Sequence, residues 1–150
     1  MAQAHSYTIT KKNNRTENEA VEYLLKANKR FIKPSKDERK KILDSLGLNG
    51  SFSRAFDLVL LPVGKKLTDV KKQDLVLVEL KTTKKKLVTN PSGFFFGATE
   101  NEFNLAKKLG EQYKFCFVSL HPESLSLKLL SLSELEKLIR TKRTQYQINL

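Results

Sequence analysis

Apolar residues recur along the chain with two different spacings, which predict two kinds of secondary structure. A spacing of three or four residues is typical of a helix with one buried face, and it appears in four segments. A Ser/Thr-x-x-Glu capping box, whose end residues bond to each other's backbone N–H groups, is a signal for a helix start. We expect helices at 16–28, 35–47, 99–112 and 133–143, with capping boxes at Thr16, Thr99 and Ser133.

Short, nearly continuous apolar runs bounded by Gly, Pro or polar residues indicate buried strands instead. We expect strands at 55–61, 74–81, 94–98, 115–120 and 125–132, with short strands at 7–10 and 146–150. Apolar runs this continuous favour burial on both faces of a sheet. The order of elements predicts one α/β domain over residues 1–150, with a central mixed β-sheet flanked by helices and a polar arm at 1–15.

Charge is the most unusual property of the composition. Lys and Arg total 28 against 16 Asp and Glu, which gives a formal net charge of +12. This excess suits a polyanionic partner, with nucleic acid first and an acidic membrane surface second. The alternative is a basic surface that serves only solubility. The hydrophobic fraction of 39% is ordinary for a folded domain.

Two features favour a reducing, cytoplasmic location. The only cysteine, Cys116, lies in an apolar run, so no intramolecular disulfide can form. The N-terminal residues lack the apolar core of a signal peptide, and no apolar stretch approaches the length of a membrane span. We therefore expect a cytoplasmic protein without a membrane segment.

Two acidic residues and a lysine interrupt the apolar strands at 55–61 and 74–81. Residues two apart on a strand point to the same face, so Glu79 and Lys81 are expected to lie together. Asp57 has poor strand propensity and would be costly to bury without a partner. If the two strands are neighbours, Asp57 and Glu79 converge at one end of the sheet.

Such a cluster has a chemical and a structural interpretation. Two carboxylates and a backbone carbonyl form a hard-oxygen site suited to Mg²⁺, which keeps several waters and binds substrate phosphate. Lys81 beside it would orient a metal-bound water and stabilise negative charge on phosphorus. In the structural alternative, Glu79 and Lys81 form an ion pair on a solvent-facing strand, and Asp57 caps a strand end.

The arrangement resembles the PD-(D/E)XK nuclease superfamily, whose signature is an aspartate on one strand and Glu-x-Lys on the next. The matching residues here are Asp57 and Glu79–Lys81, and the latter lie in the motif VELKTT. The aromatic segment, the helix in ATENEFNLAKKLG and the strand YKFCFVSL that follow are similar to nuclease-type domains of the NO VEIN C-terminal kind. The arrangement is similar over 16–130, and the residues themselves mainly over 56–119. Phe56 precedes Asp57 where the family name implies proline.

The resemblance implies a restriction-endonuclease-like three-layer domain that hydrolyses phosphodiester bonds in DNA with Mg²⁺, for which Mn²⁺ can substitute. Asp57, Glu79 and the carbonyl of Leu80 would hold the metal, and Lys81 would position the attacking water. One such site cuts one strand, so double-strand cleavage would require a homodimer. The first alternative is a non-catalytic nucleic-acid-binding module with the same fold; a less favoured one is a nuclease directed at RNA.

Several weaker signals have a functional and a structural interpretation. Glu19 would be a further metal ligand or a helix cap, and we favour the cap for it and for Glu102. Lys84, Lys85 and Lys86 directly follow the expected site and would contact DNA phosphates; otherwise they form a solvated loop.

Other signals lie farther along the chain. Phe94–Phe96 would stack on bases, although aromatic strands more often belong to a core. The basic segment 140–146 would add a DNA contact. His121 has no second histidine or cysteine at ligand spacing, which argues against zinc, and the sequence has no Gly-rich phosphate loop for ATP.

Overall fold

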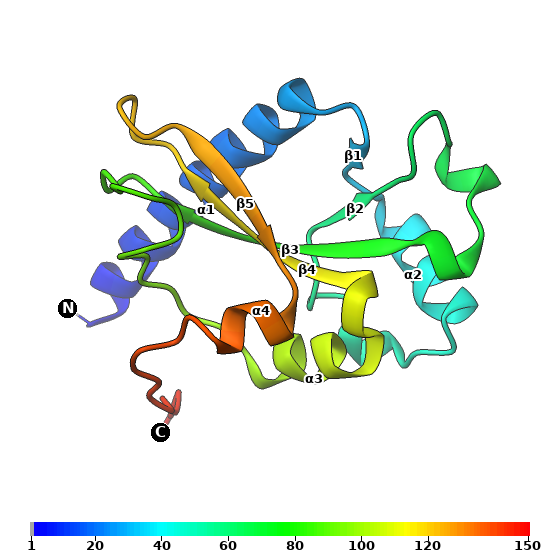
Figure 1. Cartoon of the computed structure of the whole chain (residues 1–150). Helices are drawn as coiled ribbons and strands as arrows, with labels where there is room; N and C mark the ends of the chain where they lie inside the picture. Colours follow the sequence, from blue (N-terminus) through cyan, green and yellow to red (C-terminus); the bar gives the residue numbers. More distant parts are fainter. Residues whose placement is uncertain (1) are drawn as a thin grey trace.

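A five-stranded mixed β-sheet surrounded by four helices forms the framework of the computed structural model (Figure 1), which describes residues 2–150 and side chains from Arg15 onward. This arrangement confirms the expected α/β class and mixed sheet. The strands are β1 (Phe31–Ile32), β2 (Leu58–Leu60), β3 (Val76–Thr83), β4 (Tyr113–Ser119) and β5 (Ser126–Leu130). The helices are α1 (Ala2–Ala27), α2 (Lys36–Ser45), α3 (Glu100–Leu109) and α4 (Leu132–Glu136).

The sheet places β3 and β4 at its centre, because the strands lie in the order β1-β2-β3-β4-β5. Within the described residues β3 and β4 are the one parallel pair, and α3 forms the crossover that such a pair requires. The other neighbouring strands are antiparallel. The sheet therefore has β2 antiparallel to β3 on one side and β4 parallel to it on the other.

Apolar side chains cover both faces of the sheet. Ala20 and Leu24 of α1 pack on one face, together with Leu80 and the fully buried Cys116. Residues of α2, α3 and α4 pack on the other face, around aromatic residues such as Phe115. Figure 1 shows α1 (blue) across the sheet from α3 and α4. This two-sided burial confirms the expectation drawn from the continuous apolar runs.

Helix α2 begins and ends at the residues that the sequence predicts. The hydroxyl of Ser35 accepts the N–H of Glu38 at 3.1 Å, and Glu38 accepts the backbone N–H of Ser35 at 2.9 Å, which completes a capping box. After the helix, Gly47 adopts a φ of 69°, a left-handed conformation that favours glycine.

Two of the helix predictions are wrong at their starts. Helix α1 begins at Ala2, so over residues 2–15 a helix replaces the predicted polar arm, and it also replaces the strand at 7–10 and the capping box at Thr16; position 1 of the arm lies outside the described residues. Helix α4 has its capping box at Ser131 rather than Ser133, a start that buries Leu132 and Leu135, and it ends at Glu136 rather than at residue 143. Among residues 2–150, no helix combines the length and the apolar character needed to cross a membrane.

Besides the strand at 7–10, two predicted strands do not form, and one strand was not predicted. Residues 94–98 are irregular: the rings of Phe94 and Phe96 pack on the core, but their backbone joins no ladder. Residues 146–150 are exposed and lie outside the sheet. Strand β1 has only two residues and depends on pairing with β2, where Phe31 is opposite Leu60.

Candidate functional site

The candidate site forms where β2 stops pairing with β3. The last backbone bond between them joins the N–H of Asp57 to the carbonyl of Val78 at 2.8 Å. Two residues along β3 from Val78, the N–H of Leu80 donates to the carboxylate of Asp57 at 2.7 Å. If β2 continued, a backbone carbonyl would accept this N–H instead. In an antiparallel pair the N–H and C=O of one residue point to the same side. The carbonyl of Leu80 therefore faces the edge that Asp57 occupies.

Arg39 of α2 fixes the turn that leads into Asp57, a role that sequence reasoning missed. Its guanidinium donates to the backbone carbonyls of Ser53 at 2.9 Å, Phe56, and Asp57 at 3.0 Å. It also lies over the ring of Phe56, 5.0 Å from the centroid. Three carbonyls bound by one planar cation leave little freedom for the backbone that carries Asp57. A basic residue in a helix shows no sequence signal of such long-range contacts.

Glu79 is a buried carboxyl group that lacks a full set of partners. Its exposed fraction is 5%, and its Oε1 accepts no hydrogen bond from any residue in the described part of the chain. Burial raises the pKa of Glu79 far above its ordinary value, and the neighbouring carboxyl group of Asp57 raises it further. Two carboxyl groups that share a buried site are not both ionised without cost unless a proton or a cation lies between them. A cation in place of that proton would stabilise both ionised groups.

Glu17 of α1 is a second carboxyl group beside Asp57. Burial raises the pKa of Glu17, and the charge of Asp57 and a hydrogen bond with it act in the same direction. The sequence offered Glu19 for this place, as a metal ligand or a helix cap. The helix-cap interpretation is wrong, because Glu19 lies inside α1 rather than at its start. Glu19 contacts Lys84 at 3.4 Å and Arg15 at 3.8 Å on the surface, and its role as a metal ligand stays a prediction.

Lys81 lies on the same face of β3 as Glu79, as the alternation of a strand predicts. Its Nζ is 2.7 Å from Oε1 of Glu102 and 3.4 Å from Oε2 of Glu79. Burial lowers the pKa of Lys81, but the charges of the two glutamates outweigh it and leave the pKa above its ordinary value. Glu102 makes the shorter contact with the ammonium group and acts together with Glu79 to keep Lys81 charged.

Glu102 has a different role from the one predicted. Its backbone N–H donates to the hydroxyl of Thr99 at 3.1 Å, so half of the expected capping box is present. Its side chain contacts Lys81 instead of completing the box, and its exposed fraction is 6%. The capping pattern in the sequence therefore concealed a residue that connects α3 to the site.

Tyr113 closes the buried side of the site. Its hydroxyl donates to the backbone carbonyl of Ala55 at 2.6 Å. Burial raises the pKa of Tyr113, and the negative charges of Glu79, Glu102 and Asp57 raise it further. Tyr113 is therefore a neutral hydrogen-bond donor at physiological pH and does not serve as a base.

The side chains present fit a divalent cation with few protein ligands. Over the described residues, no group of three or more His, Cys, Asp and Glu is arranged to hold a metal ion. Glu17 adjoins Asp57 without completing such a group. The predicted set has two carboxylates, Asp57 and Glu79, and the backbone carbonyl of Leu80. Mg²⁺ tolerates a set of this size because it keeps several waters.

The lysines that follow β3 are partly engaged with carboxylates. Lys84 contacts Glu19 at 3.4 Å and Lys86 contacts Glu123 at 2.5 Å. Both lysines are more than half exposed, and exposed pairs of this kind are weak. Phosphates can therefore displace these carboxylates, and the predicted DNA contact stays a prediction.

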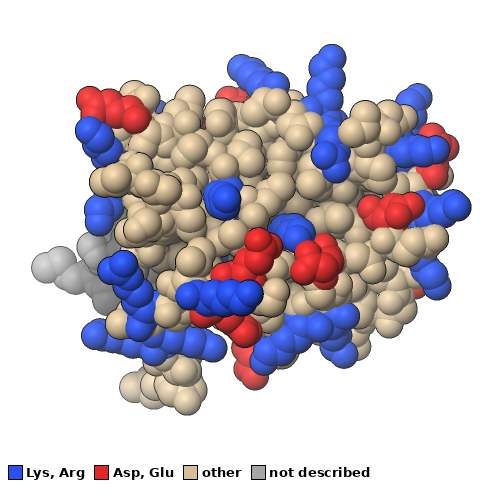
Figure 2. All heavy atoms as spheres, viewed as in Figure 1, with Lys and Arg blue, Asp and Glu red and all other residues tan. Residues whose placement is uncertain are grey.

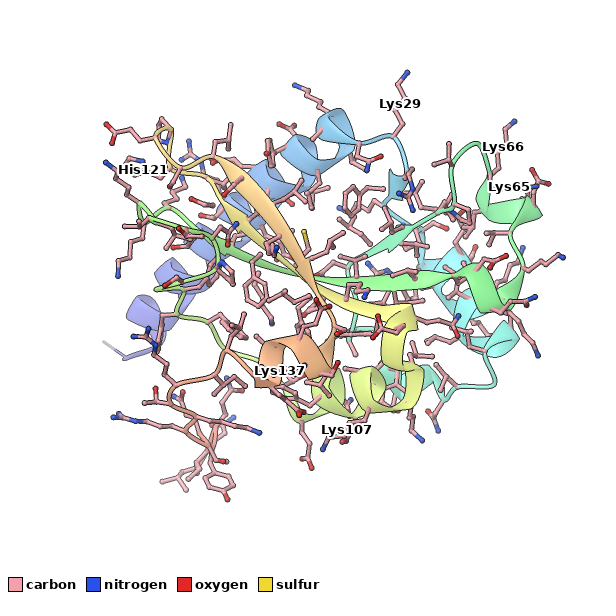
Figure 3. The ribbon with its side chains drawn as sticks, viewed as in Figure 1. Lys29, Lys65, Lys66, Lys107, His121 and Lys137 are labelled. Atoms are coloured by element: carbon pink, nitrogen blue, oxygen red, sulfur yellow. The ribbon has the colours of Figure 1, made fainter. Side chains whose placement is uncertain are left out.

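On the face drawn in Figure 2, positive charge is spread out rather than gathered in one stripe. Figure 2 shows Lys and Arg around most of one face, with acidic side chains near its middle. Lys65 and Lys66 project at the right-hand end of the molecule and Lys29 at its top, and His121 lies at the left-hand end (Figure 3). The Nδ1 of His121 accepts the N–H of Glu123 at 3.1 Å within a turn.

Comparisons with models of protein families, with curated proteins and with solved structures found no match to this chain. The chemistry of the site is therefore the support for a function.

Proposed function

We propose that the protein is a Mg²⁺-dependent DNA endonuclease of the PD-(D/E)XK type with a restriction-endonuclease-like fold. One observation supports this function above all: the buried, unpartnered oxygen of Glu79 lies in a cluster with Asp57 and the ammonium group of Lys81. A structural ion pair needs only one carboxylate for each lysine. Excess buried acid costs stability unless a cation relieves it, so selection for a metal site accounts for the cluster.

The residues divide into metal ligands and a group that acts on the substrate. Asp57, Glu79 and the carbonyl of Leu80 would hold Mg²⁺, or Mn²⁺ in its place. The bound ion would supply Lewis-acid chemistry, lowering the pKa of a coordinated water and neutralising charge on the phosphate. Lys81 would donate hydrogen bonds to the attacking water and to the phosphate oxygens.

The raised pKa of Lys81 limits its role. A lysine whose pKa lies above its ordinary value keeps its proton at neutral pH, so it does not take a proton from the water. It orients the water and stabilises the negative charge that develops on phosphorus. Glu102 acts through Lys81: the 2.7 Å contact holds the ammonium group in place and keeps it charged.

The surroundings of the site support a nucleic-acid substrate. The net charge of +12 favours a polyanion, and the open end of β2 leaves the Leu80 edge without a neighbouring strand. A double-strand break would need two such sites, as in a homodimer. The rival function is a non-catalytic nucleic-acid-binding module, which the small number of metal ligands favours.

A cleavage assay separates the two functions. Supercoiled plasmid and branched DNA are incubated with the protein in Mg²⁺, in Mn²⁺ or in EDTA, and metal binding is followed by calorimetry. We expect metal-dependent nicking that Asp57→Asn and Glu79→Gln abolish. Glu22→Gln is the matched control, because Glu22 is an exposed carboxyl group on α1.

The outcome with the carboxylate variants decides between nuclease and binding module. Loss of cleavage with normal folding and normal DNA affinity supports the nuclease. If the parent protein binds DNA but does not cut it under any metal condition, the nuclease assignment is wrong and the binding module replaces it.

A further inference from the structure

Three consecutive phenylalanines precede α3, and the structure separates them into two kinds. The rings of Phe94 and Phe96 each lie 5.0 Å from the ring of Phe117, in edge-to-face geometry. Phe95 lies between them and is 94% exposed. Because both neighbours are held by the same core residue, the backbone cannot turn to bury Phe95. Its ring is presented to solvent on a fixed segment.

This segment lies against the candidate site. Phe117 of β4 is directly opposite Lys81 in the parallel ladder, and residues opposite each other in such a ladder have their side chains on the same face. The segment then continues into α3, where Glu102 contacts Lys81 at 2.7 Å. The segment that carries Phe95 is therefore connected to Lys81 in two ways. Its neighbouring rings pack on Phe117, which is opposite Lys81, and the helix that follows it carries Glu102, which contacts Lys81.

A single exposed apolar side chain is common on protein surfaces, so exposure alone does not identify a contact. The distinguishing property of Phe95 is the anchored backbone on both sides of it, since a backbone that is already held in place loses little conformational entropy when its side chain binds. An aromatic ring also stacks on any nucleobase, because every base has a π-face.

The charges nearby favour a nucleic-acid strand over an apolar protein surface. The ammonium group of Lys142 lies 4.9 Å from the ring centroid of Phe103 in the first turn of α3. Arg140 and Arg143 flank this lysine and are exposed. A strand that contacts Phe95 would therefore meet basic side chains that can neutralise its phosphates.

We propose that Phe95 stacks on a nucleobase of the strand whose phosphate lies at Asp57, Glu79 and Lys81. This inference rests on the proposed nuclease function and adds a base contact to it. The contact is independent of base identity, so it positions the strand for cleavage without selecting a sequence.

The absence of tryptophan from the chain permits a direct test. Phe95→Trp introduces one indole at the position in question, and stacking on a base quenches its fluorescence. The variant is titrated with 20-nucleotide single-stranded and duplex DNA in EDTA, so that no cleavage occurs. We expect quenching that saturates with DNA, and binding within about two-fold of the parent. Phe95→Ala should lose affinity by about 5- to 100-fold, the range found when one stacking residue is removed.

Val63→Trp is the matched control, since Val63 is 80% exposed. Val63 lies two residues before Lys65 in the chain, and Lys65 projects at the right-hand end of the molecule in Figure 3. The fluorescence of Val63→Trp should not change on addition of DNA.

The outcomes distinguish failure of this inference from failure of the nuclease function. If the parent cuts DNA while Phe95→Ala binds as tightly and Phe95→Trp is not quenched, the stacking contact is refuted and the nuclease stands. If the parent neither binds nor cuts DNA, the nuclease function fails and the stacking contact fails with it. If Phe95→Ala instead abolishes self-association measured by light scattering and leaves DNA affinity unchanged, Phe95 is a contact between copies of the chain, which also overturns the proposal.

Discussion

Replacing Glu79 with glutamine should stabilise the metal-free protein at neutral pH. The folded-state pKa of Glu79 lies above its ordinary value of 4.5, because burial and Asp57 disfavour its charged form. Below pH 4.5 the group is protonated in both the folded and the unfolded state and has no effect on stability. Above that pH the unfolded chain releases the proton while the native protein retains it, so stability falls as pH rises. Glutamine is neutral and keeps a donor for Asp57, so it removes this loss.

The gain in the free energy of unfolding has an upper limit that is set by the unfolded-state pKa and the pH of the experiment. A difference of one bound proton changes the free energy of unfolding by about 1.4 kcal/mol per pH unit. Starting from an unfolded pKa of 4.5, the limit is about 3 kcal/mol at pH 7 and below about 1 kcal/mol at pH 5. We expect a gain of about 1–3 kcal/mol at pH 7 that shrinks toward pH 5.

Urea unfolding in EDTA, followed by circular dichroism at both pH values, measures this gain. Glu22→Gln serves as the control, since an exposed carboxyl group on α1 should change stability little at either pH. A Glu79→Gln protein that is less stable than the parent at pH 7 would show that Glu79 is ionised and paired with Lys81, contrary to the reasoning. A gain of equal size at pH 5 and pH 7 would refute the proton linkage.

Four further predictions concern the candidate site, the basic segment after β3 and the buried thiol. Lys81→Ala should lower the cleavage rate by about 100-fold or more with metal binding retained. Glu102→Gln should lower kcat with KM unchanged, whereas the control Glu100→Gln should leave both kcat and KM unchanged; a change in KM alone would assign Glu102 to substrate binding. Replacing Lys84–Lys86 with alanine should flatten the dependence of DNA affinity on salt concentration, and an unchanged slope in the binding titration would remove this segment from the interface. Burial raises the pKa of Cys116 to about 12, so its thiol should resist iodoacetamide at pH 8 in the native protein and react after denaturation; rapid labelling of the folded protein, detected by mass spectrometry, would contradict this.

Local periodicity was enough to predict the features that depend on near neighbours. The alternation of a strand puts Glu79 and Lys81 on one face wherever that strand lies in the fold, and their 3.4 Å contact follows from it. The capping box at Ser35 satisfies backbone groups within one turn, so α2 starts where the pattern indicates. Continuous apolar runs similarly required a sheet buried on both faces, whichever elements would cover it.

Contacts between distant segments were decided only by the tertiary structure. The choice of Glu17 rather than Glu19 beside Asp57 depends on how α1 crosses the sheet, since positions two apart on a helix face different directions. The segment 94–98 has strand-forming residues but no strand beside it, so its rings are buried without a ladder. Glu102 carries a capping signal that accounts for its backbone alone; its side chain bonds to Lys81, 21 residues earlier in the chain. The carboxylate of Glu102 could have bonded to the backbone at the start of α3, and the position of α3 beside the sheet brings it to Lys81 instead.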